Sequence, residues 1–116
     1  MDVWQEYVKS FGFGQKLGID IPGELPGSIP GSATYDRIYG KNAWRSLTVI
    51  SLAIGQGEIG ATPLQLANLA AVMANRGHYY TPHLVREIPE DPQFSPAVER
   101  HQVMVDSTYF PVIVEG

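Results

Sequence analysis

Apolar side chains at the start of the chain recur every three or four residues, at Val3, Trp4, Tyr7, Val8 and Phe11. This spacing predicts a short amphipathic helix over Asp2–Phe11. Gly12 and Gly14 follow directly and are expected to end it.

The clearest helix signal covers Thr62–Arg76. Thr62 suits the N-cap, Pro63 suits the first helical position, and Gln65 completes a Thr-x-x-Gln capping box. Gly77 stands where a left-handed residue is favoured after a helix. The intervening residues are apolar on nearly every face, which predicts a helix buried in a larger body. The polar interruptions are Gln65, Asn68 and Asn75.

A glycine-rich segment separates this helix from an apolar run over Leu47–Ile54. The run fits a strand or a buried helical turn equally well, and Ser46 is a candidate cap for the turn. The glycines after it allow positive φ, so we expect a structural bend there. The residues assigned to this bend are Gly55, Gln56, Gly57 and Thr62.

Prolines and glycines dominate Lys16–Gly31, where a Pro-Gly step recurs at 22–23, 26–27 and 30–31. Each unit is too short to bury a face, so we expect successive turns rather than a repeat fold. A flexible linker is the alternative, but regularly placed aliphatic side chains argue against it. The loop is therefore expected to lie pinned on the body. Its aliphatic residues are Ile19, Ile21, Leu25 and Ile29.

Aromatic and charged residues alternate between Thr34 and Trp44. One interpretation is a binding surface. We prefer aromatic anchors that hold a long loop, with the charged groups in solvent. The aromatic residues are Tyr35, Tyr39 and Trp44.

Beyond the main helix the pattern indicates short strands. The first comprises Leu84, Val85 and Ile88. Pro82 suits the first position of that strand. Alternation at Val103 and Val105 indicates another strand, and an apolar run follows over Val112–Val114. Two or three strands without a complete sheet are typical of a piece of a larger domain.

Composition narrows the function classes. The formal net charge of -4 lacks the basic footprint that nucleic acids require. The chain has no cysteine, which excludes disulfides and thiolate zinc sites. No apolar stretch approaches the roughly 20 residues of a membrane-spanning helix, and Met1 does not begin a signal-peptide pattern.

The spacing Gly55-x-Gly57-x-x-Gly60 matches the letters of the dinucleotide-binding fingerprint. In that motif the third glycine lies inside the helix, whereas Pro63 here places the helix start beyond it. Glu58 also brings a negative charge to the position of a pyrophosphate. We therefore set a nucleotide-binding unit aside as the weaker alternative.

Histidines and carboxylates offer two further hypotheses. The spacing of the histidines fits no tight metal-ligand pattern, so no metal site and no cofactor are predicted. Asp20 and Glu24 could be paired carboxylates of a hydrolase, but in a proline-glycine loop we interpret them as turn and capping groups. The residues considered as metal ligands are His78, His83, His101, Glu87, Glu90 and Asp91.

Three stretches together resemble class B penicillin-binding proteins, in particular the elongation-type penicillin-binding protein 2 group. They are FGFGQKLGIDIPGE at Phe11–Glu24, ISLAIGQGEIGATPLQLANLAAVMANRG at Ile50–Gly77 and YYTPHLV at Tyr79–Val85. The resemblance covers residues 1–90 closely and the remainder more loosely. It implies a mostly α segment with long loops and a few short strands, from an α+β penicillin-binding/β-lactamase-like transpeptidase domain.

The resemblance implies acyl transfer by a serine. Members of the family use a Ser-x-x-Lys nucleophile motif, a Ser-x-Asn motif and a Lys-Thr-Gly strand. In this sequence no serine has lysine three residues later, no Ser-x-Asn occurs, and Lys16-Leu17-Gly18 belongs to a different part of the family pattern. No catalytic residue is therefore carried over. The resemblance places 1–116 as a single fragment between the Ser-x-Asn and Lys-Thr-Gly motifs.

As implied by the resemblance, the parent cross-links peptidoglycan stem peptides, binds β-lactams and works with cell-wall elongation proteins. Its expected location is the bacterial inner membrane, with this domain on the periplasmic side. The fragment itself is expected to be inactive scaffold with a tendency to self-associate. The alternative from another class is a non-enzymatic interaction module that uses exposed aromatic residues. These are Trp4, Tyr35, Tyr39 and Trp44.

Overall fold

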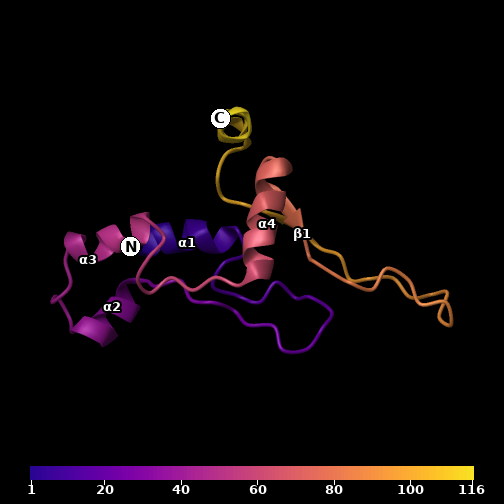
Figure 1. Cartoon of the computed structure of the whole chain (residues 1–116), viewed down its shortest axis with the longest axis horizontal. Coiled ribbons are helices and arrows are strands. Elements are labelled where there is room, and N and C mark those ends of the chain that lie inside the picture. Colours follow the sequence, from indigo (N-terminus) through magenta and orange to yellow (C-terminus); the bar gives the residue numbers. More distant parts are fainter.

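Helix α4, Pro63–Ala74, stands near the middle of an elongated molecule of 58 × 35 × 18 Å. A computed structural model describes all 116 residues. Helices α1, α2 and α3 lie on one side of α4, and a long loop that follows β1 projects on the other side (Figure 1).

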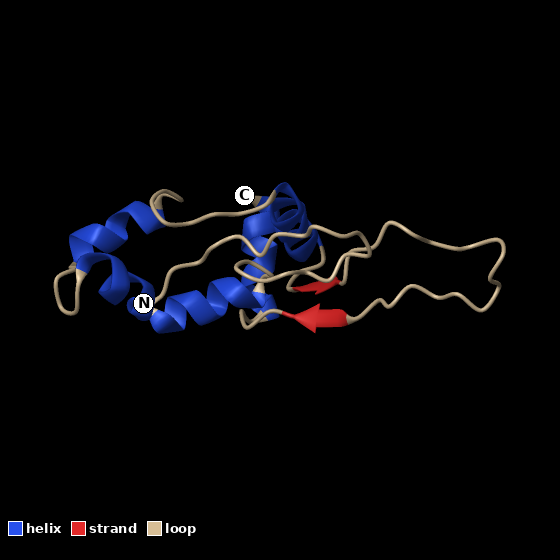
Figure 2. Ribbon diagram, turned by 90° about the horizontal axis from the view of Figure 1, so that it is seen from below, coloured by secondary structure: helices blue, strands red, loops and turns tan.

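Helices supply most of the regular structure, and one pair of strands supplies the rest (Figure 2). This confirms the predicted class of a mostly α segment with long loops and short strands. None of the helices has the length and apolar character needed to cross a membrane. The helices are α1 Asp2–Ser10, α2 Ser32–Tyr39, α3 Ser46–Ala53, α4 Pro63–Ala74, the 3-10 helix η1 Ser107–Tyr109 and α5 Phe110–Glu115.

The predicted start of α4 is confirmed, but its end differs by one position. The first residue with positive φ after the helix is Arg76, at 57°, and Gly77 follows it with φ of 109°. The Arg76 N–H donates to Met73 O at 3.1 Å and the Gly77 N–H donates to Val72 O at 3.0 Å, which is a Schellman motif. Gly77 is still required, because a Cβ there would lie 2.9 Å from the Phe110 ring.

The prediction of a loop over Thr34–Trp44 is wrong, because its first half is helix α2. Its aromatic residues are nevertheless the predicted anchors. Tyr35 is fully buried, and its ring centroid lies 5.7 Å from that of Tyr39 and 5.5 Å from that of Trp44. The long-range contact of this helix is the Tyr35 hydroxyl with Glu58, which the local pattern could not reveal.

The ambiguous apolar run forms helix α3 rather than a strand. Its N-cap is Arg45, and the expected cap, Ser46, is instead the first helical residue. The Thr48 hydroxyl accepts a hydrogen bond from the Arg45 N–H at 3.4 Å. This contact belongs to the first turn of a helix and has no counterpart in a strand.

Strands β1, His78–Tyr80, and β2, Arg100–Gln102, pair antiparallel with Tyr79 opposite His101. The predicted strand over residues 84–88 is wrong, since this segment is extended loop with no ladder partner. The expected strand around Val103 is also wrong, because β2 ends before it, and the apolar run over 112–114 lies in α5.

The core is small and lies where α4 meets β1 and α5. Only 14 of 116 residues are buried, so many large apolar side chains stay exposed. Helix α4 was expected to be buried in a larger body, and residues 1–116 by themselves cover only part of it. Its fully covered residues are Gln65, Asn68 and Val72, while Leu66 is 54% exposed. The core cluster consists of Leu17, Val72, Tyr79, Val103 and Phe110.

Candidate functional site

The predicted bend before α4 is present. Gly55 and Gly57 adopt positive φ values of 72° and 81°. The Gln56 N–H donates to Ser51 O at 2.9 Å, which ties the bend to the end of α3. The Gln56 residue itself is exposed, so the backbone is held while the carboxamide faces outward.

Glu58 connects this bend to helix α2. One carboxylate oxygen accepts from the Tyr35 hydroxyl at 2.8 Å and the other accepts from the Tyr39 hydroxyl at 2.7 Å. The Tyr39 and Tyr35 hydrogen bonds hold the pKa of Glu58 below its usual value. Burial, followed by the hydrogen bond to Glu58, raises the pKa of Tyr35 to about 12. The pair is therefore a neutral donor facing an ionised acceptor at neutral pH.

Thr62 and Gln65 form the predicted capping box. The Thr62 hydroxyl accepts from the Gln65 N–H at 3.2 Å, and the Thr62 N–H donates to Gln65 Oε1 at 3.0 Å. Together the two bonds satisfy backbone donors that the start of a helix otherwise leaves free.

The other end of the Gln65 carboxamide holds distant loops. Gln65 is only 1% exposed. Its Nε2 donates to Pro26 O at 2.8 Å and to Gln15 O at 3.0 Å, with a longer contact of 3.4 Å to Gly12 O. Neighbouring Asn68 similarly donates to Phe11 O at 3.0 Å. The two polar residues of α4 thus fix the segment after α1 through its backbone carbonyls.

The proline-glycine loop is pinned on the body, as predicted. Ser28 and Gly60 exchange both backbone hydrogen bonds in an isolated bridge, at 2.6 and 2.8 Å. Gly27, at φ of 65°, allows this approach, because a Cβ there would lie 2.4 Å from Gly60 O and 2.8 Å from Gln65 Oε1. Ile29 is buried, which confirms the role expected for at least this aliphatic residue.

Asp20 and Glu24 stabilise backbone turns, as the sequence indicated. The Glu24 carboxylate accepts from the N–H groups of Leu17, Gly18 and Ile19. Asp20 accepts at 2.8 Å from each of two consecutive N–H groups that lie 64 and 65 residues further along the chain. The sequence did not indicate this long-range partner.

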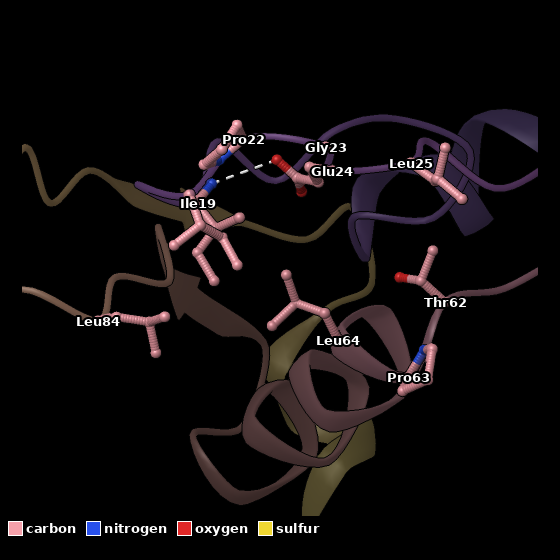
Figure 3. Close-up of a pocket in the computed structure, with 10 residues that line it drawn as sticks. Ile19, Pro22, Gly23, Glu24, Leu25, Thr62, Pro63, Leu64 and Leu84 are labelled. Atoms are coloured by element: carbon pink, nitrogen blue, oxygen red, sulfur yellow. Dashed lines mark hydrogen bonds between the residues drawn. The ribbon is translucent and has the colours of Figure 1, made fainter.

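An apolar groove of about 450 Å³ lies between the loop, the start of α4 and the segment after β1. Figure 3 shows Ile19, Leu64 and Leu84 around the same space, with the Ile19 N–H donating to Glu24 on the loop side at 3.3 Å. Thr62 lies on its rim, but its hydroxyl is engaged in the helix cap. The groove therefore offers apolar contact and little polar chemistry.

The histidines are in structural contacts. The His101 ring stacks on Tyr79 with centroids 4.8 Å apart, and its Nε2 lies 2.9 Å from the Thr81 hydroxyl. His78 packs edge-on against Tyr80. No three His, Cys, Asp or Glu side chains gather in a way that could hold a metal ion.

The structure therefore brings Gly55, Gln56, Gly57 and Thr62 into one ordered connection but gives that connection no nucleophile and base. The fingerprint interpretation fails on geometry as well, because Gly60 lies in the bridge to the loop and outside helix α4. What sequence reasoning missed is the set of polar residues that hold this connection. For Gln65 the signal was incomplete: the capping box was visible, whereas its carbonyl partners were not.

Residues 1–113 match the family model described as the penicillin binding protein transpeptidase domain. The chain belongs to this family. A curated transpeptidase-family relative, the peptidoglycan D,D-transpeptidase MrdA of Acinetobacter baumannii, is 42% identical over 86 residues, covering 74% of this chain and 13% of the relative.

Two solved structures of the transpeptidase family are similar to this chain. Pseudomonas aeruginosa PBP2, solved in complex with WCK 5153, has a TM-score of 0.77 at 34% identity over 95% of this chain and 25% of the neighbour. PBP2 from Helicobacter pylori, solved in a complex with MreC, has a TM-score of 0.69 at 25% identity over 90% of this chain and 18% of the neighbour. The chain thus spans a quarter or less of these proteins.

Proposed function

We propose that residues 1–116 are a scaffold segment of a PBP2-type peptidoglycan D,D-transpeptidase. The observation that supports this most directly is the backbone agreement with Pseudomonas aeruginosa PBP2, a TM-score of 0.77 over 95% of the chain. The relatives named as peptidoglycan D,D-transpeptidases support the same activity for the parent.

The proposed chemistry is acyl transfer through a serine acyl-enzyme, with every reacting group outside this chain. Nucleophilic catalysis requires a nucleophile within hydrogen-bond reach of a base. The chain has no Ser-x-x-Lys, Ser-x-Asn or Lys-Thr-Gly motif. In this proposal the segment lies between the second and third of these motifs in the parent. Stem peptides and β-lactams bind at the motifs rather than to residues 1–116.

The role proposed for the segment is to hold the connection before α4 in one conformation close to the cleft. Glu58 fixes the bend to α2 through two tyrosine hydroxyls, and Gln65 fixes α4 to the loop carbonyls. A cleft whose supporting residues are held in one conformation keeps its reacting groups in fixed relative positions.

The partners and location proposed for the parent follow the same family. The Helicobacter pylori neighbour was solved with MreC, which supports an elongation-type partner for the parent. We place the parent at the bacterial inner membrane with this domain on the periplasmic side.

Labelling with a fluorescent penicillin tests the proposal. The full-length polypeptide that carries this chain is expected to give a labelled band, and residues 1–116 alone are not. A full-length variant with alanine at the serine of its Ser-x-x-Lys motif is the matched control and should lose the label. A labelled 1–116 fragment, or an unlabelled full-length protein, would overturn the assignment of roles.

Neither alternative gains support from a specific contact. Two of the four aromatic residues expected to form an interaction module are engaged within the chain, since Tyr35 is buried and the Trp44 Nε1 donates to Asp36 at 2.8 Å. The nucleotide-binding unit lacks a glycine-rich helix start, because α4 begins at Pro63.

A further inference from the structure

The long loop between the two strands, residues 82–98 and here called the arm, stands away from the body (Figure 1). Its root is closed by β1 and β2 and by the Thr81 N–H, which donates to Glu99 O at 2.8 Å. Beyond the root, the other backbone–backbone hydrogen bonds of the arm join two residues of the arm itself, such as Asp91 N–H to Ile88 O at 2.9 Å.

Asp20 supplies the only hydrogen bonds that join the arm to a distant part of the chain. Its Oδ1 accepts from the Leu84 N–H and its Oδ2 accepts from the Val85 N–H, each at 2.8 Å. Two consecutive amides aimed at two oxygens require a carboxylate. An asparagine offers one oxygen and turns an NH2 donor toward the second N–H.

We propose that Asp20 is a positioning residue that clasps the arm and sets its direction. Because Leu84 lines the groove together with Ile19 and Leu64, the same clasp also holds one groove wall in place (Figure 3). The arm and the groove are therefore one coupled unit: a ligand that moves the arm must also shift Leu84, and occupation of the groove must bias the arm.

A second carboxylate, that of Glu24, allows loss of the Asp20 contact to be distinguished from a general loss of stability. Glu24 organises the same loop through the N–H groups of Leu17 and Gly18, without touching the arm. Release of Asp20 is expected to free the arm and leave the Glu24 turn intact. This inference does not depend on the transpeptidase assignment, so its failure leaves that assignment standing.

Residue-resolved hydrogen exchange of the full-length polypeptide tests the clasp. In Asp20→Asn, the Leu84 and Val85 amides are expected to exchange about tenfold faster, the factor for loss of one charge-assisted hydrogen bond. The Leu17 and Gly18 amides should keep their rates. Asp106→Asn is the matched control, because Asp106 also accepts two hydrogen bonds but only from its neighbour Thr108.

A distance measurement supplies the second readout. Residues 1–116 contain no cysteine, so spin labels at Glu90→Cys in the arm and Lys9→Cys in α1 report the arm direction within this chain. The distance distribution should broaden in Asp20→Asn and not in Asp106→Asn. Unchanged exchange at Leu84 with an unchanged distribution would overturn the proposal, as would equal acceleration at the Glu24-bound amides.

Discussion

Replacement of Gln65 by leucine tests the idea that one carboxamide holds the loops around α4. The substitution keeps the side-chain volume similar but removes every polar contact of a residue that is 1% exposed. Pro26 O then loses its donor at 2.8 Å, and the Thr62 N–H loses its acceptor at 3.0 Å. Gln15 and Pro26 are exposed residues, so water can replace the donor that each carbonyl loses, whereas Gly12 is buried and its carbonyl loses a contact of 3.4 Å.

The magnitude follows from the two groups that lose their partner in buried or half-buried residues, the Gly12 carbonyl and the Thr62 N–H. A buried polar group without a hydrogen bond costs about 1–3 kcal/mol, so Gln65→Leu is expected to lower the free energy of unfolding by about 4 kcal/mol. A domain of this size has only about 5–15 kcal/mol in total. The variant should therefore lose between a quarter and most of its stability.

Urea unfolding of the chain, followed by far-UV circular dichroism, measures this loss as a lower midpoint at constant slope. Gln93→Leu is the matched control, because Gln93 is exposed and its carboxamide makes no hydrogen bond within the chain. The free energy of unfolding of that control should stay within about 0.5 kcal/mol of the value for the unsubstituted chain. A loss below about 1 kcal/mol for Gln65→Leu would refute the reasoning.

Three further predictions use the same molecule. Gly27→Ala should cost at least about 2 kcal/mol in urea unfolding, from positive φ plus the clash with Gly60 O, whereas Gly23→Ala, with positive φ but open space, should cost about half as much. Tyrosinate absorbance should show a tyrosine titrating at about 12, and because the Tyr35 pKa is raised on folding, stability should fall as pH rises from about 10 to 12. The Glu58 pKa is lowered on folding, so its contribution should be present above pH 4.5 and lost as pH falls through the folded value, a loss that Glu58→Gln should abolish in acid unfolding curves.

Local chemistry made the start of α4 predictable. Thr62, Pro63 and Gln65 are within four positions of one another, and their capping interactions involve only the first turn. The end of the helix was less certain because residues other than glycine can adopt positive φ, and here Arg76 does so one position before Gly77. The class of the chain followed from the resemblance to class B penicillin-binding proteins rather than from these local signals.

Long-range partners explain what the sequence could not show. Helix α2 depends on Tyr35, whose hydroxyl meets Glu58 23 residues later, and strand β1 depends on β2, more than 20 residues away. A window of local periodicity contains neither partner. The burial of the polar residues of α4 could not be predicted for the same reason, since Gln65 and Asn68 are covered where loop carbonyls from elsewhere meet them.

The hydrogen bonds of Gln65 also constrain the order in which the chain can assemble. Its three carbonyl partners precede it by 39, 50 and 53 residues. Contacts between such distant positions must first offset the entropy of closing a large loop, which makes them slow to form. On the ribosome, the segment from Gly12 to Pro26 is synthesised before Gln65 and must wait for it, so its stable conformation is reached late in synthesis.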